Sequence, residues 1–162
     1  MGVLTIDSPL GPLVLRSAGG ALTSLDWATG PKDDPDEVLR AAALQLADYF
    51  AGRRAAFDLP LRPAGSAFQQ RVWAAMGEIA YARTATYGDL AHRLGTAARA
   101  VGGACGRNPL PIIIPCHRVV GGQGKPGGYS GHGGLETKGW LLAHERAHVA
   151  AHPHAGTAVP AP

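Results

Sequence analysis

The chain has 162 residues, of which 46% are hydrophobic and 17% charged, and this suits one or two compact domains with a real apolar core. It has no stretch long and apolar enough to span a membrane, and no charged region followed by a long apolar run as in secretory signals, so we expect a cytoplasmic protein without a membrane partner. The net charge of +3 is unevenly divided, because residues 1–60 hold eight acidic against five basic side chains and residues 61–162 hold four against ten.

A small α/β domain is predicted over residues 1–64. Three short runs bounded by turn residues have the pattern of strands: residues 3–7, 12–17 and 21–27. A helix that Asp34 or Asp36 can cap follows them and runs to about Phe50. Nothing in this domain indicates catalysis, and Tyr49 is interpreted as a core residue. We therefore expect the domain to support the second half of the chain.

A mainly helical domain is predicted over residues 65–150. Three polar residues stand before runs of helical spacing: Ser66 for a helix to Met76, Thr86 for Tyr87–Leu94, and Thr96 for Ala97 to about Cys105. The last two helices, separated by a glycine-containing turn, predict a helix-turn-helix. The basic excess of this half fits a polyanionic partner, although ordinary surface charge accounts for it equally well.

The second of these two helices is built of small residues, with Arg99 as its one side chain able to pair with base edges. A sequence-specific reader needs several such side chains, so this helix could approach DNA closely without reading its sequence. The other interpretation is a tightly packed helix with one solvated arginine.

Cys116 lies between Pro115 and His117, after the apolar run Pro111–Ile114 and before the glycine-rich stretch Gly121–Gly134. This pattern predicts a thiol carried by a buried strand to the mouth of a flexible loop, where a thiolate is a strong nucleophile. Adjacent side chains on a strand point to opposite faces, so the cysteine and the histidine meet only if the backbone turns between them. A buried cysteine beside a chance histidine is the other interpretation.

The segment Asn108–Val120 resembles the active-site signature of the O6-alkylguanine-DNA alkyltransferases, a family of direct-reversal DNA repair proteins. Further segments resemble the family in the same order along the chain: Leu46–Gly52, Phe57–Leu61, Thr86–Ala91, Arg99–Ala104, Gly128–Gly131 and Lys138–Glu145. The resemblance covers roughly residues 3 to 146, and several matches in order are far more specific than one short motif.

The resemblance implies a small α/β N-terminal domain over residues 1–64, with a three-stranded antiparallel sheet plus a helix in a ribonuclease-H-like arrangement. It implies a mainly helical, winged helix-turn-helix-like alkyltransferase domain that binds DNA over residues 65–150. The tail over residues 151–162, rich in Ala, His and Pro, is predicted to be disordered.

The implied activity is an irreversible, single-turnover transfer of an alkyl group, typically methyl, from O6-alkylguanine to Cys116, with O4-alkylthymine as a further substrate. The product is a thioether, which cellular thiols do not readily reverse, so the protein is expected to be consumed. The implied partner is double-stranded DNA, bound through the minor groove without sequence specificity and with the target nucleotide rotated out of the stack. A monomer without cofactor or metal is expected, and zinc is not, because no cysteine precedes Cys105.

Four residues receive catalytic roles from the resemblance. Cys116 is the nucleophile, and His117 is the base that forms the thiolate through a bridging water. Glu145 holds the histidine in its tautomer, as an acid does in catalytic triads, although a helix-end salt bridge to Arg118 is its simpler interpretation. The hydroxyl of Tyr129 is implied to donate a hydrogen bond near O6 of the leaving guanine.

Six more residues are implied to bind the DNA or the base: Tyr87, Arg99, Asn108, Arg118, Ser130 and Lys138. Tyr87 crowds the phosphate beside the target, and Arg99 takes the place of the extruded nucleotide. Asn108 fixes the turn before the active-site segment. Without the resemblance, Tyr87 is a core aromatic and Lys138 a surface lysine.

Two departures from the family's pattern stand out. Ala80 and Ala82 occupy positions where the family has proline and glycine, and the loop from Tyr129 to Leu135 is two residues longer than usual. The added residues lie in a glycine-rich stretch, so we expect this loop to be mobile and the pocket to admit larger groups such as benzyl. The other interpretation is an insertion that bulges into solvent without effect.

Two other functions fit parts of the sequence. A non-catalytic DNA-binding relative would recognise alkylated guanine and recruit other repair, but such relatives lack the cysteine. A cysteine hydrolase would use Cys116 and His117 and release product many times. A disulfide between Cys105 and Cys116 is the alternative to a free nucleophile, and a reducing compartment argues against it.

Overall fold

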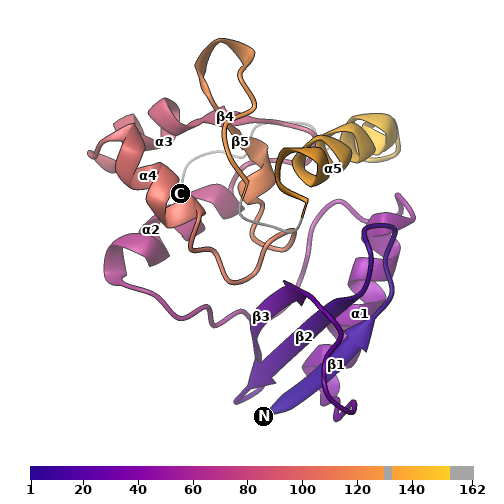
Figure 1. Ribbon diagram of the computed structural model, residues 1–162. Coiled ribbons are helices and arrows are strands. Elements are labelled where there is room, and N and C mark those ends of the chain that lie inside the picture. The colour runs from indigo at the N-terminus through magenta and orange to yellow at the C-terminus, as the bar shows by residue number, and fades with distance from the viewer. Residues whose placement is uncertain (130–132, 154–162) are drawn as a thin grey trace.

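The N-terminal domain is a three-stranded antiparallel sheet covered by one helix (Figure 1). The computed structural model describes residues 1–129 and 133–153. The strands lie side by side in chain order: β1 (Gly2–Ile6), β2 (Leu13–Ala18) and β3 (Ala21–Trp27). Leucines of β2 and β3 are fully buried together with Leu39 and Leu46 of α1 (Glu37–Phe50). The predicted strands and helix are confirmed to within one or two residues at their ends.

Helix α1 begins at the second of the two predicted caps. The side chain of Asp36 accepts a hydrogen bond from the backbone N–H of Leu39 at 3.0 Å, and it also accepts one from the hydroxyl of Ser17 on β2. These bonds hold the pKa of Asp36 below its ordinary value, with the Ser17 bond as the largest cause. The start of the helix is thereby fixed to the sheet.

The second domain begins with α2 (Ala67–Gly77) and continues into a helix-turn-helix made of α3 (Tyr87–Leu94) and α4 (Ala98–Cys105). Ser66 and Thr86 cap α2 and α3 as predicted, each in a reciprocal capping box. The prediction that Thr96 caps α4 is wrong, because α4 starts at Ala98 after Ala97 and has no side-chain cap. The backbone N–H of Thr96 is instead used to close the end of α3, donating to Ala91 O at 2.9 Å.

The apolar run before Cys116 is a series of tight turns, and the prediction of a buried strand there is wrong. Ile112 has a positive φ of 74°, and Ile114 N donates to Leu110 O at 2.8 Å. Three prolines in Pro109–Pro115 lack the N–H that a strand ladder needs, which explains why no strand forms. A 3-10 helix, η1 (Cys116–Arg118), follows these turns. It leads into β5 (Val119–Val120), which pairs in parallel with β4 (Ala85–Thr86).

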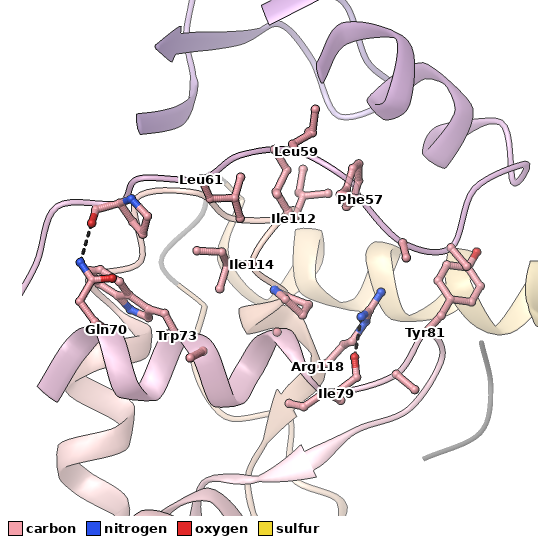
Figure 2. A pocket seen from close by; sticks show the side chains of 18 residues that line it. Phe57, Leu59, Leu61, Gln70, Trp73, Ile79, Tyr81, Ile112, Ile114 and Arg118 are labelled. Carbon is pink, nitrogen blue, oxygen red and sulfur yellow. Dashed lines mark hydrogen bonds between the residues drawn. The ribbon is translucent and has the colours of Figure 1, made fainter. Parts of the chain in front are cut away.

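The segment at residues 57–61, which follows α1, faces the turns before Cys116. Figure 2 shows Phe57, Leu59 and Leu61 around a pocket that is also lined by Ile112 and Ile114. This pocket has a volume of about 450 Å³, so residues 57–61 form one of its walls and the turns before Cys116 form another.

The last α-helix of the described residues is α5 (Gly134–His148), which lies beside the C-terminal end of α1 and is followed by a short 3-10 helix, η3 (Val149–Ala151) (Figure 1). The tail was predicted to be disordered from Ala151 onward, but its first residues are held. His152 Nε2 lies 2.9 Å from Gly52 O, and its ring packs edge-on against Tyr81. The remainder of that prediction, residues 154–162, lies outside the described residues. Within the described part of the chain, no helix is long and apolar enough to cross a membrane.

Candidate active site

Cys116 lies in the wall of a pocket of about 560 Å³ between α4 and the segment that ends at Tyr129. Four of the predicted site residues line it together: Tyr87, Arg99, Cys116 and Tyr129. The other lining residues are small or sulfur-containing, namely Ala98, Gly102, Cys105, Gly106 and Gly128. Arg99 is exposed on α4, so its guanidinium is available at the edge of the pocket. A cavity of this size accepts a group as large as a nucleobase.

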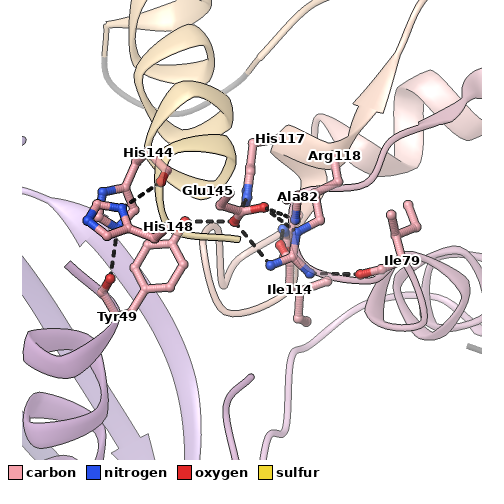
Figure 3. Close-up of polar contacts among 10 residues, drawn as sticks. Tyr49, Ile79, Ala82, Ile114, His117, Arg118, His144, Glu145 and His148 are labelled. Carbon is pink, nitrogen blue, oxygen red and sulfur yellow. Dashed lines mark hydrogen bonds and ion pairs between the residues drawn. The ribbon is translucent and has the colours of Figure 1, made fainter. Parts of the chain in front are cut away.

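His117, which directly follows Cys116, forms a fully buried pair with Glu145 (Figure 3). His117 Nε2 lies 2.7 Å from Glu145 Oε2, across 28 residues of sequence. Arg118 also binds the carboxylate, with Nε donating to Oε1 at 2.9 Å and a terminal N–H to Oε2 at 3.0 Å. Both interpretations of Glu145 made from the sequence, as the partner of the histidine and of the arginine, therefore describe the same carboxylate.

Two further groups donate to the carboxylate of Glu145. The backbone N–H of Ala82 donates to Oε1 at 3.0 Å, and the hydroxyl of Tyr49 donates to Oε2 at 2.8 Å. Ala82 has a positive φ of 61°, a conformation that favours the glycine found there in the family. The turn in which Ala80 and Ala82 depart from the family's pattern thus places one of the hydrogen-bond donors of Glu145.

The protonation states within the pair follow from these contacts. Burial acts to raise the pKa of Glu145, but the hydrogen bond with His117 and the hydrogen bonds and charge of Arg118 outweigh it and hold the pKa well below its ordinary value. Burial lowers the pKa of His117, against the opposing effect of Glu145. A neutral imidazole that donates from Nε2 to Glu145 leaves Nδ1 unprotonated. This Nδ1 is buried and has no hydrogen-bond partner among the described residues, so it is free to act as a base.

The thiol of Cys116 needs such a base. Burial raises its pKa above the ordinary value of 9.0, while Asn108 and Lys138 act in the opposite direction. At neutral pH the group is therefore mainly a thiol, and a proton must leave before it attacks. Both cysteines are free, which excludes the disulfide considered from the sequence. Burial also raises the pKa of Cys105, to about 12, so this neighbour is the poorer nucleophile.

Asn108 holds the turns that lead to Cys116. Its side-chain amide donates to Ile114 O at 2.9 Å, and its side-chain oxygen accepts from Leu110 N at 3.0 Å. One buried side chain therefore bridges both ends of this short segment. These two bonds hold the turn before the active-site segment, which is the structural role predicted for Asn108.

Lys138 is buried, which overturns its interpretation as a surface lysine. Its Nζ donates to Val119 O at 2.6 Å and to Gly128 O at 2.9 Å, and it lies 5.7 Å from the centre of the Tyr87 ring. It therefore ties β5 to the segment before Tyr129, and burial lowers its pKa. Tyr87 is half-buried between these groups and the pocket, rather than part of a sealed core.

The hydroxyl of Tyr129 is buried and has no hydrogen-bond partner among the described residues, while its ring packs edge-on against Trp27 of β3. A donor without a partner at the pocket is what the predicted contact with O6 requires. Ser130, Gly131 and His132, which belong to the longer loop predicted to be mobile, lie outside the described residues.

Nothing in the sequence indicated that Tyr49 contacts this site. It was interpreted as a core residue, and it is fully buried, but its hydroxyl reaches Glu145 across 96 residues of sequence. A local sequence pattern cannot predict a contact between residues that lie so far apart in the sequence. Cys105 was also unassigned, and only its position on the inner side of α4 shows that it lines the pocket.

Comparison with known proteins connects both domains to one family. The DNA-binding domain of 6-O-methylguanine DNA methyltransferase matches residues 67–147, and the ribonuclease-like domain of the same family matches residues 3–63. A methylated-DNA–protein-cysteine methyltransferase of Mycolicibacterium paratuberculosis is 45% identical over 154 residues, covering 89% of this chain and 92% of the relative. The corresponding protein of Methanosarcina acetivorans is 44% identical over 146 residues, covering 84% and 92%.

Solved structures give the same result. The crystal structure of Mycobacterium tuberculosis OGT in complex with DNA has a TM-score of 0.80 at 46% identity, and covers 89% of this chain and 92% of that chain. An O6-methylguanine DNA methyltransferase from Methanococcus jannaschii has a TM-score of 0.64 at 31% identity, with 89% and 92% covered.

Proposed function

This chain belongs to the 6-O-methylguanine DNA methyltransferase family, and we propose that Cys116 is the cysteine that accepts the alkyl group. The protein binds DNA and repairs it by direct reversal, passing an alkyl group from O6-alkylguanine to one of its own cysteines. The observation that supports Cys116 is its position in the wall of the pocket, directly before the histidine that pairs with Glu145.

In the proposed reaction, His117 Nδ1 takes the thiol proton through a bridging water, since Nε2 is committed to Glu145. The thiolate of Cys116 then attacks the alkyl carbon. The S–C bond forms as the C–O6 bond breaks, and the electron pair of that bond leaves on guanine O6. The hydroxyl of Tyr129 donates a hydrogen bond to this oxygen as negative charge develops there.

On the DNA side, we propose that α4 lies in the minor groove and binds without sequence specificity. Its small residues allow a close approach, and Arg99 fills the space left by the rotated nucleotide. Tyr87, beside the pocket, crowds the phosphate next to the target. We also propose that the protein acts as a monomer in the cytoplasm and needs no cofactor. O4-alkylthymine in DNA is proposed as a further substrate.

Counting methyl groups separates this function from hydrolysis by a cysteine enzyme. Excess duplex DNA carrying radiolabelled O6-methylguanine should transfer label to the protein until one group is bound per molecule, and then stop. Release of more than one equivalent of free methanol would instead show a hydrolase. A transferase keeps the methyl group as a thioether on its cysteine and therefore cannot turn over again.

Arg99→Ala should slow transfer from duplex DNA by roughly tenfold or more and leave transfer from the free base O6-methylguanine nearly unchanged. The arginine acts only when a gap in the base stack must be filled, and the free base creates none. Single-turnover rates on the two substrates give the comparison. Arg40→Ala, the same charge change at an exposed site on α1, is the control and should resemble the unmodified protein. Equal slowing by Arg99→Ala on both substrates would contradict this role.

A further inference from the structure

We infer that Tyr49, on helix α1 of the N-terminal domain, positions the carboxylate of Glu145 against His117 and so contributes to alkyl transfer. This inference rests on the proposed function and deepens it. It adds a residue that acts through Glu145 and His117 and does not touch the substrate.

The inference rests on one oxygen atom of Glu145, which contacts both Tyr49 and His117. Tyr49 donates from its hydroxyl to Glu145 Oε2 at 2.8 Å, and the same Oε2 lies 2.7 Å from His117 Nε2. All three side chains are fully buried, so the contact is direct and shielded from solvent (Figure 3). Arg118 also donates to Oε2, at 3.0 Å, so three groups hold this oxygen, and Tyr49 is the one of them that comes from the N-terminal domain. A carboxylate held in this way has little freedom to rotate away from the imidazole.

The tyrosine is itself held at both ends by consecutive residues of α5. Glu145 accepts from its hydroxyl, and His144 Nε2 lies 2.8 Å from its backbone oxygen. The ring of His144 is stacked on Trp140, with centroids 4.9 Å apart and planes 10° apart. The end of α1 and the catalytic part of α5 are therefore fixed to each other. Through these contacts the N-terminal domain helps to set the position of Glu145, and therefore of His117.

The charges around the pair decide what loss of the hydroxyl does. The charged groups that face His117 are Glu145 and Lys138 from α5 and Arg118 from its own turn, and Tyr49 and Tyr81 are the titratable groups that interact with Glu145 from other elements. Without the Tyr49 hydroxyl, Oε2 carries more unshared negative charge toward His117. The protonated imidazole is then favoured, so the pKa of His117 rises, while the carboxylate becomes freer to turn.

Tyr49→Phe is the direct test, because it removes the hydroxyl and keeps the ring. We expect the single-turnover rate constant at its high-pH plateau to fall roughly tenfold, with an unchanged Kd for the alkylated duplex. The acid limb of the pH–rate profile should move to higher pH, since more base must be added before His117 is neutral. These two readouts distinguish positioning from a purely structural role, which would lower only the temperature of unfolding.

Tyr81→Phe is the matched control. Tyr81 is equally buried and its ring lies 6.4 Å from that of Tyr49, but its hydroxyl has no hydrogen-bond partner among the described residues. This variant should keep the unmodified rate and pH profile. A Tyr49→Phe protein with the unmodified rate and acid limb, or an equal change in Tyr81→Phe, would overturn the inference while leaving the proposed function intact. An unmodified protein that transfers no alkyl group would overturn both.

Discussion

Cys116→Ala is expected to abolish alkyl transfer, by a factor on the order of 10⁴ or more, and to leave the affinity for DNA close to that of the unmodified protein. The sulfur atom of Cys116 forms the new bond to the alkyl carbon, and alanine has no nucleophilic group to take its place. The surface around Tyr87 and Arg99, which we propose to bind DNA, does not depend on it. Transfer of labelled methyl groups and gel-shift titrations on one preparation measure the two properties separately.

Cys105→Ala is the control for this experiment, since Cys105 is the other thiol that lines the pocket. The control should still accept one methyl group per molecule, because the high pKa of Cys105 makes it the weaker nucleophile. Loss of both binding and transfer in a folded Cys116→Ala protein would count against the assignment.

Glu145→Gln is expected to cause the largest loss of stability, about 3–5 kcal/mol, together with a large loss of transfer. The carboxylate accepts hydrogen bonds from four side-chain or backbone partners, and its removal leaves the buried charge of Arg118 without an opposite charge. The neutral amide of glutamine also stabilises a protonated His117 less than the carboxylate of Glu145 does. Urea unfolding at pH 7 gives the free energy, and single-turnover kinetics give the rate.

The pH dependence of unfolding provides the control for this prediction. Because the pKa of Glu145 is depressed in the folded protein, its stabilisation is fully present above the ordinary value of 4.5 and is lost as the pH falls toward the folded pKa. The difference in the free energy of unfolding between the unmodified protein and Glu145→Gln should therefore narrow below about pH 4.5. A difference that stays constant from pH 7 to pH 3 would show that ionisation of Glu145 is not the source of the stability.

Local signals in the sequence predicted the helices well. Ser66 and Thr86 act as caps because each is followed three residues later by a side chain that returns a hydrogen bond, and such pairs are visible in the sequence. Thr96 failed as a cap because α4 begins at Ala98, which leaves Ala97 at the cap position, while the backbone N–H of Thr96 belongs to the end of the preceding helix. Helix boundaries of this kind depend on two elements at once, which a single run of residues does not reveal.

The active-site segment was predicted less well, for a related reason. Its apolar residues resemble a buried strand, yet the prolines on either side of Ile112–Ile114 prevent strand pairing and favour the tight turns that Asn108 holds. The contact between Tyr49 and Glu145 could not be predicted at all. It depends on how the two domains pack, and neither residue stands in a local pattern that points to the other.

The most direct test of this account is the position of the transferred group. The protein is reacted with one equivalent of duplex DNA containing O6-methylguanine, digested, and analysed by peptide mass spectrometry. We expect an added methyl group on the peptide that contains Cys116, at one per molecule, and an unmodified Cys105. A methyl group on Cys105, or an unmodified Cys116 after the DNA has been repaired, would contradict it.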